Sequence, residues 1–132
     1  MSIHSEAHLS RKLSAFFKLL NVYLNHFPKA EKYALAGRIR NTAYEIWDLV
    51  VEGQKRYHKK TTLTSLDIAH ERLRMQLYLA YELGYFQFKD GRKGADAAPT
   101  ELHRYTTITA SCDEIGRMIG GWIIKIKEDQ KW

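Results

Sequence analysis

The helical character of this chain is clearest in DEIGRMIGGWIIKIK, residues 113–127. The apolar positions of this stretch recur every three or four residues, which is the spacing of one face of an α-helix. That face consists of Ile115, Ile119, Trp122 and Ile126. Gly116, Gly120 and Gly121 interrupt the same helix, although each interior glycine costs roughly 1 kcal/mol relative to alanine. We therefore expect these glycines and the adjacent Trp122 to serve close packing, either against a helix of the same bundle or against another subunit.

The same spacing recurs in the first half of the chain. One helix is predicted from about Ser5 to Phe27, with its apolar face at Leu9, Leu13, Phe16, Leu20, Tyr23 and Phe27. Pro28 disfavours helical backbone at Phe27 and suits the first turn of a following helix, so a second helix is predicted from Pro28 to about Tyr57. Its apolar face comprises Leu35, Ile39, Ile46, Val50 and Tyr57, with Tyr44, Trp47 and Val51 beside them.

Two further helices are predicted in the second half. The third begins near Thr64, because Thr64 and Asp67 resemble a capping box, and its inner face is Leu66, Ala69, Leu73, Leu77, Ala80 and Gly84. The Asp90-Gly91 pair predicts a turn. The fourth helix runs from about Thr100 to Lys127 and adds Leu102, Tyr105 and Cys112 to the face described above. Four helices of roughly 20 to 30 residues with short connections predict an all-α, up-down-up-down four-helix bundle, in one domain over residues 1–132.

Positive charge is concentrated in the first half of the chain. The formal net charge is +6, and the densest basic run is KRYHKK, residues 55–60. The candidate contacts to a polyanion in this half are Arg38, Arg40, Lys55, Arg56, Lys59 and Lys60. Phosphate contacts need only positive charge within reach, but a charged helix face that is merely solvated has the same composition. Within the run, Tyr57 and His58 are candidates for stacking on bases, unless Tyr57 completes the apolar face.

Other functional classes find little support in the sequence. The single cysteine, Cys112, lies on an apolar face and is predicted to be a buried, inert thiol, which suits a reducing cytoplasm. No apolar run reaches the roughly 20 residues of a membrane-spanning helix, and the first residues do not resemble a signal peptide. His4 and His8 lie one helical turn apart but have no evident third ligand for a metal. We expect no cofactor, no metal and no catalytic activity.

Four motifs together resemble the accessory variability proteins of diversity-generating retroelements. They are FPKAEKYALAGRIR (27–40), EIWDLVVEG (45–53), LDIAHERLRMQLYLAYELGYF (66–86) and DEIGRMIGGWIIKIK (113–127). The chain is also similar to the four-helix proteins encoded in bacterial ribosomal-RNA intervening sequences. The segment IGRMIGGW, residues 115–122, favours the retroelement branch.

The resemblance implies more than the spacing does. Such proteins are four-helix bundles that form barrel-like homopentamers with a basic surface. They bind the reverse transcriptase of the element and nucleic acid, and they support mutagenic copying of a template RNA into a variable gene. Arg74 matches a basic position of the third helix, whereas Tyr78 replaces a second expected basic residue. Arg117, within the IGRM motif, is expected at a subunit contact or on the basic surface.

A second function stays open on the sequence. A structural homo-oligomer of the intervening-sequence type would contact proteins rather than nucleic acid. Its basic surface would then serve solvation, and the glycine-containing face would be its main functional feature.

Overall fold

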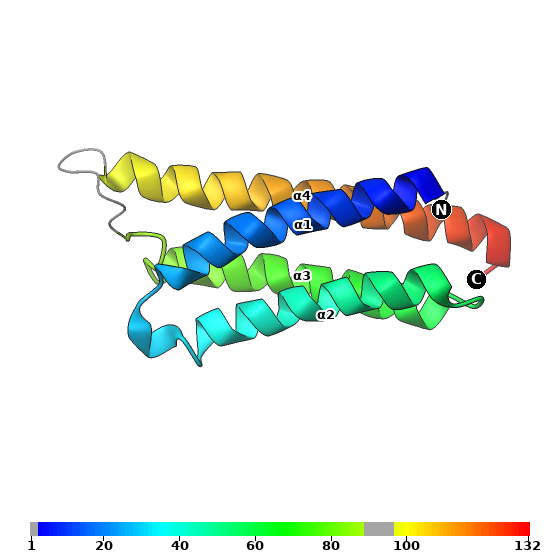
Figure 1. Cartoon of the computed structure of the whole chain (residues 1–132), viewed down its shortest axis with the longest axis horizontal. Coiled ribbons are helices and arrows are strands. Elements are labelled where there is room, and N and C mark those ends of the chain that lie inside the picture. Colours follow the sequence, from blue (N-terminus) through cyan, green and yellow to red (C-terminus); the bar gives the residue numbers. More distant parts are fainter. Residues whose placement is uncertain (1–2, 89–96) are drawn as a thin grey trace.

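The computed structural model describes residues 3–88 and 97–132, and within these two ranges it contains helices and no strand. The four long helices are α1 (Ile3–Asn25), α2 (Leu35–Lys55), α3 (Lys60–Glu82) and α4 (Ala97–Gln130), with a short 3-10 helix η1 (Lys29–Glu31) between α1 and α2. Successive helices run in opposite directions, and both termini lie at the end of the bundle opposite η1 (Figure 1). The predicted all-α, four-helix architecture is confirmed.

Each helix packs against two neighbours, so that the four form a closed ring in chain order. The contact between α2 and α3 is the most extensive, whereas α1 and α2 share the fewest contacts of the four neighbouring pairs. The predicted apolar faces meet in the centre, and most of their members are buried: Leu9, Leu13, Phe16, Leu20, Tyr23, Phe27, Ile39, Ile46, Val50, Leu66, Ala69, Leu73, Leu77, Ala80, Cys112, Ile115, Ile119, Trp122 and Ile126. This burial explains why four separate amphipathic patterns form one folded unit.

The predicted starts of two helices are wrong, and side-chain bonds explain both differences. Helix α2 begins at Leu35 rather than Pro28, because the Glu31 carboxylate accepts a hydrogen bond from the Leu35 backbone N–H at 2.9 Å and caps the helix there. Helix α3 begins at Lys60 rather than near Thr64. The Thr64 hydroxyl instead donates to the Lys60 carbonyl oxygen at 2.7 Å, so it lies inside the first turns and forms no capping box with Asp67.

The end of α3 also differs from the prediction. Gly84 was expected on the inner face, but its φ of 79° places it in the left-handed region that terminates helices. The backbone N–H groups of Gly84 and Tyr85 donate to the carbonyl oxygens of Tyr81 and Ala80, which is the pattern of a Schellman motif. The turn predicted at Asp90-Gly91 lies outside the described residues.

Four apolar residues assigned to the second helix and one assigned to the fourth are exposed rather than buried. The exposed fractions are 82% for Tyr57, 57% for Tyr44 and 52% for Leu102, and Trp47 and Val51 are also exposed. Tyr57 lies beyond the last residue of α2, where the chain turns toward α3, so helical spacing no longer applies to it. The aromatic residues Tyr44 and Trp47 face the loosely packed side of α2, toward α1.

The sequence also gave no sign that Arg104 would be buried. Only 4% of its surface is accessible, and its guanidinium group donates to the carbonyl oxygens of Phe86 and Phe88, both at 2.8 Å. The same group lies 3.7 Å from the centre of the Phe88 ring. Arg104 therefore ties α4 to the segment that follows α3, with hydrogen bonds that compensate for burying its charge.

Candidate functional site

The predicted basic cluster at residues 55–60 is partly engaged in holding the turn between α2 and α3. Arg56 forms an ion pair with Glu52 at 3.0 Å. The Lys59 ammonium group donates to the carbonyl oxygens of Gly53 at 2.5 Å and of Arg56 at 2.7 Å. Lysine in this position satisfies carbonyl groups that the end of a helix leaves without intrahelical partners. Lys55 and Lys60 are exposed and present their charge to solvent.

The same turn is anchored by the C-terminal end of α4. The Gln130 side chain accepts a hydrogen bond from the Lys59 backbone N–H at 3.1 Å and donates to the Tyr57 carbonyl oxygen at 2.5 Å. The Tyr57 and His58 rings contact each other at nearly a right angle, with their centres 4.8 Å apart. This end of the bundle therefore has an ordered backbone and two outward-facing aromatic rings.

The opposite end holds a second basic region, between α1 and the η1–α2 segment. Lys29, Lys32, Arg38 and Arg40 line one pocket there, with a volume of about 880 Å³. Arg38 and Arg40 were predicted from the sequence, whereas Lys29 and Lys32 were not singled out. Lys29 and Lys32 belong to the motif FPKAEKYALAGRIR, and in one continuous helix they would share a face with Arg40 but not with Arg38. The break in the helix at η1 brings all four residues to one pocket.

The pocket continues along the bundle into a second one of about 480 Å³, which also lies between α1 and α2. The two pockets share Leu24, Arg40 and Tyr44, and we call them together the α1–α2 groove. Lys18 adds a fifth basic side chain to its walls, and no Asp or Glu occurs among the described residues that line it. The groove is therefore positively charged over its whole length. It exists because α1 and α2 are the least extensively packed neighbours.

Polar contacts across the groove hold Arg40 in place. Its guanidinium group donates to the side-chain oxygen of Asn21 and to that of Asn25, the latter at 2.7 Å. Both partners are neutral amides of α1. The contacts thus fix the orientation of the side chain without cancelling its charge.

Aromatic rings accompany the basic groups of the groove. Tyr33 is 89% exposed, and Tyr44 lines both pockets. The Lys32 ammonium group lies 5.4 Å from the centre of the Tyr33 ring. Toward the middle of the bundle, Phe17 and Trp47 contact each other across the groove with ring centres 5.9 Å apart. Basic and aromatic side chains therefore line the same groove.

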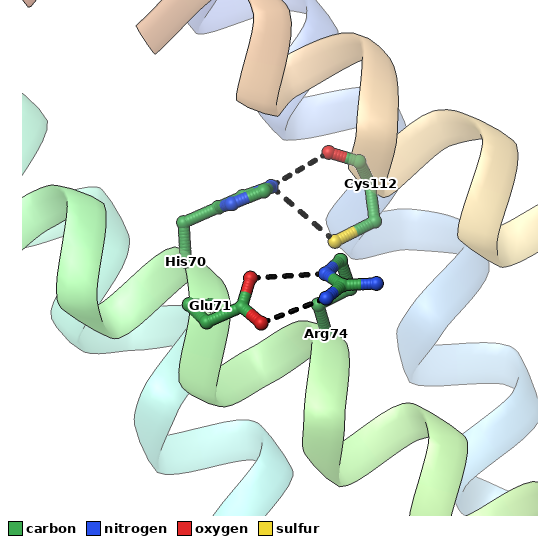
Figure 2. Close-up of polar contacts among 4 residues, drawn as sticks. All are labelled: His70, Glu71, Arg74 and Cys112. Carbon is green, nitrogen blue, oxygen red and sulfur yellow. Dashed lines mark hydrogen bonds and ion pairs between the residues drawn. The ribbon is translucent and has the colours of Figure 1, made fainter. Parts of the chain in front are cut away.

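Arg74 and Arg117, the two remaining predicted basic residues, lie away from this groove on α3 and α4. Arg74 forms an ion pair with Glu71 at 2.7 Å on the surface of α3 (Figure 2). The hydrogen bond from Arg74 lowers the pKa of Glu71 and raises the pKa of Arg74 itself. Arg117 is exposed on α4. The structure therefore distributes the predicted basic residues over several surfaces instead of gathering them at one.

Cys112 is buried between α3 and α4, as predicted. The His70 Nε2 atom lies 2.8 Å from the Cys112 carbonyl oxygen and 3.6 Å from its sulfur atom (Figure 2). Burial raises the pKa of the thiol to about 12, which keeps it protonated at neutral pH. A thiol in this state is a poor nucleophile, and the adjacent imidazole serves the packing of the two helices.

The glycines of α4 divide between two environments. A Cβ atom at Gly116 would lie 2.5 Å from the His70 ring, so this glycine permits close packing of α4 on α3 within the chain. Atoms added at Gly120 or Gly121 would meet nothing within 4 Å. The intramolecular interpretation therefore holds for Gly116, whereas Gly120 and Gly121 leave open space at the surface. Trp122 packs closely against Gly53 of α2, because a Cβ atom added at Gly53 would lie 2.8 Å from the indole ring.

His4 and His8 line a pocket of about 600 Å³ between α1 and α4, which Gly121 and Trp122 also border. No group of three or more His, Cys, Asp or Glu side chains with the geometry of a metal site occurs within residues 3–88 and 97–132. No helix in that part of the chain is long and apolar enough to cross a membrane.

The fold and the groove together define a class of protein: a basic four-helix bundle whose helices leave a charged, aromatic-lined surface open. A family model described as bAvd-like matches residues 7–126. The chain belongs to this family, which corresponds to the accessory variability proteins that the sequence motifs resemble. No curated protein and no solved structure shows a significant match to the chain.

Proposed function

We propose that this chain is a non-enzymatic accessory protein that binds nucleic acid and a reverse transcriptase, and that it supports mutagenic retrohoming of a diversity-generating retroelement in the cytoplasm. Membership of the bAvd-like family supports the accessory role. The structural observation that carries the nucleic-acid part is the α1–α2 groove, whose walls hold five basic side chains. Such a surface acts by attraction and positioning. It neutralises phosphates and releases their counterions, and it breaks no covalent bond.

Binding to a structured RNA, followed by fluorescence anisotropy over a range of salt concentrations, tests this function. Affinity should fall steeply as salt rises, because each neutralised phosphate contributes about −0.7 to the logarithmic slope on single strands and about −0.9 on duplex. Absence of binding at low salt would refute nucleic-acid binding and move the search to protein partners.

Two charge-reversed variants of equal net charge locate the surface. Lys29→Glu/Lys32→Glu alters the groove, whereas Lys55→Glu/Lys60→Glu alters the turn between α2 and α3 while preserving the hydrogen bonds of Lys59. If the groove makes the contacts, the first variant should reduce the slope by about 1.4 on single-stranded RNA and the second should change it less. An equal effect of both variants would indicate attraction by net charge alone.

We further propose that the chain assembles into a homopentamer. Ile68, Met75, Leu79 and Leu83 recur at helical spacing along α3, and each is about half exposed. Arg72 lies between Ile68 and Met75 on the same side of α3, and around it these residues form an exposed apolar stripe of the kind found at protein interfaces. The open space at Gly120 offers a second place where another subunit can approach.

Native mass spectrometry of Gly120→Leu tests the glycine surface. No atom of the other helices lies within 4 Å of a Cβ atom added at this position, so the helical content should be retained while the assembly dissociates. An unchanged mass would exclude Gly120 from the interface.

The apolar face of α3 also supports the second function, a structural homo-oligomer that contacts proteins. Under that function the basic groups serve solvation. The two functions differ in one outcome: only the first requires RNA binding that weakens with salt and with the loss of Lys29 and Lys32.

A further inference from the structure

The α1–α2 groove contains more than the positive charge that phosphate binding needs. Tyr33 is the most exposed of the large hydrophobic side chains that the structure describes. It lies in the turn between η1 and α2, beside lysines on an ordered backbone. An exposed aromatic ring beside a lysine offers a face on which an unpaired base can stack. The rings of the groove therefore suit an occupant with flat faces.

We infer that the α1–α2 groove binds single-stranded nucleic acid, with unpaired bases stacked on Tyr33 and Tyr44 and phosphates held by Lys29, Lys32 and Arg38. The inference rests on the proposed function and specifies which form of nucleic acid this surface takes. Base stacking on aromatic side chains is available only to bases whose faces are exposed. In a duplex, neighbouring base pairs cover those faces.

The shape of the groove agrees with a single strand. Its two pockets adjoin through Leu24, Arg40 and Tyr44, so the concave surface continues from η1 to the middle of the bundle. The apolar side chains of Leu24, Phe27 and Ala36 form part of the wall. A strand lying there would place bases against apolar and aromatic groups and its backbone against the lysines and arginines.

The charge of the groove distinguishes nucleic acid from an ordinary polypeptide. The lining contains five basic residues and no acidic one among the described residues. The neighbouring acid Glu31 is turned away into hydrogen bonds with the Tyr85 hydroxyl at 2.7 Å and the Leu35 backbone N–H. A polyanionic partner therefore complements the charge of the groove. A single strand combines this negative charge with flat apolar faces in one molecule.

The test compares a fluorescein-labelled single-stranded RNA of mixed sequence with the duplex formed by adding its complement, each titrated with the full chain at one salt concentration. We expect tighter binding to the single strand. Tyr33→Ala should weaken single-strand binding about 5- to 150-fold, the range found for removal of one stacked base, and leave duplex binding nearly unchanged. Tyr33→Phe keeps the ring and should bind as the wild type does.

Tyr78→Ala is the matched control, because Tyr78 is a half-exposed tyrosine on α3 outside the lining of the groove. Tyr33 is so exposed that its replacement should leave the melting temperature unchanged, and a thermal melt of each variant verifies this. Equal effects of Tyr33→Ala and Tyr78→Ala on the single strand would overturn the inference.

The outcomes separate this inference from the proposed function. Salt-dependent binding of single strand and duplex with equal affinity, insensitive to Tyr33→Ala, would overturn the stacking site and leave nucleic-acid binding standing. No binding of either RNA at low salt would overturn both. If the groove variants instead weaken only capture of the purified reverse transcriptase, the groove is a protein-binding surface and the inference is wrong.

Discussion

Replacement of Gly116 by alanine tests the closest contact between α3 and α4. The new Cβ atom would lie 2.5 Å from His70 Cε1 and 2.9 Å from Nε2, distances that real Cβ contacts do not show. The imidazole must therefore move, although it is buried and lies at hydrogen-bond distance, 2.8 Å, from the Cys112 carbonyl oxygen. Overpacking of this kind costs about 1–3 kcal/mol, and a lost hydrogen bond costs about 1 kcal/mol. The gain in helix propensity offsets about 1 kcal/mol, so we expect a net loss of about 1–3 kcal/mol.

Gly121→Ala supplies the matched control on α4, because Gly121 is exposed and lies outside the contact with His70. No atom lies within 4 Å of the added Cβ, so only the propensity term remains and the variant should gain up to about 1 kcal/mol. The two variants should therefore differ by about 2–4 kcal/mol in free energy of unfolding. Urea denaturation at one protein concentration measures this difference, and the melting temperatures should differ by roughly 6–16 °C. Equal stability of the two variants would refute the contact.

A double-mutant cycle identifies His70 as the obstacle. In a His70→Ala background the space beside Gly116 is vacant, so Gly116→Ala should stabilise the protein there instead of destabilising it. If Gly116→Ala destabilises both backgrounds equally, the strain lies elsewhere in α4.

Two further predictions concern the polar contacts at the η1 end of the bundle. Arg104→Lys should cost about 2 kcal/mol in urea denaturation, because a lysine cannot reproduce the charged hydrogen bonds of the buried guanidinium group. The control, Arg72→Lys, changes an exposed side chain and should cost less than about 0.5 kcal/mol. Similar losses of stability in the two variants would contradict this prediction. A hydrogen bond from the Tyr85 hydroxyl, and after it one from the Leu35 backbone N–H, lower the pKa of Glu31. The ionised carboxylate therefore stabilises the fold at pH values above its ordinary pKa, and this stabilisation is lost as the pH falls through the lowered pKa. Glu31→Gln should therefore melt below the wild type at pH 7, with the gap closing toward pH 3, and a gap that is constant with pH would show that the charge is irrelevant.

The helices and their inner faces were predictable from the sequence because both depend on local spacing. Ile115, Ile119 and Trp122 share a face in any α-helix, whatever lies opposite them. The family motifs added the identity of the bundle, which the family model over residues 7–126 confirmed. Short connections between long helices then left few arrangements other than antiparallel neighbours.

The helix boundaries were less predictable because competing side-chain bonds decide them. Thr64 followed by Asp67 has the composition of a capping box, yet the hydroxyl bonds back to Lys60 inside the helix. Likewise Pro28 suits a first helical turn, but Glu31 caps Leu35 and moves the start of α2. Each of these side chains has more than one backbone partner within reach, so the sequence pattern alone does not rank the alternatives.

The candidate site depended on tertiary structure for a different reason. Lys32 and Tyr33 are surface residues without periodicity, and only the turn at η1 places them beside Arg38 and Tyr44 in one groove. The sequence by itself determined four amphipathic helices, their antiparallel order and the excess of positive charge, since these follow from spacing and composition. Lys59 bonds to carbonyl groups only three and six residues away in the chain. Which basic residues face an open groove was decided only by how closely each pair of helices packs, because that distance depends on residues far apart in the chain.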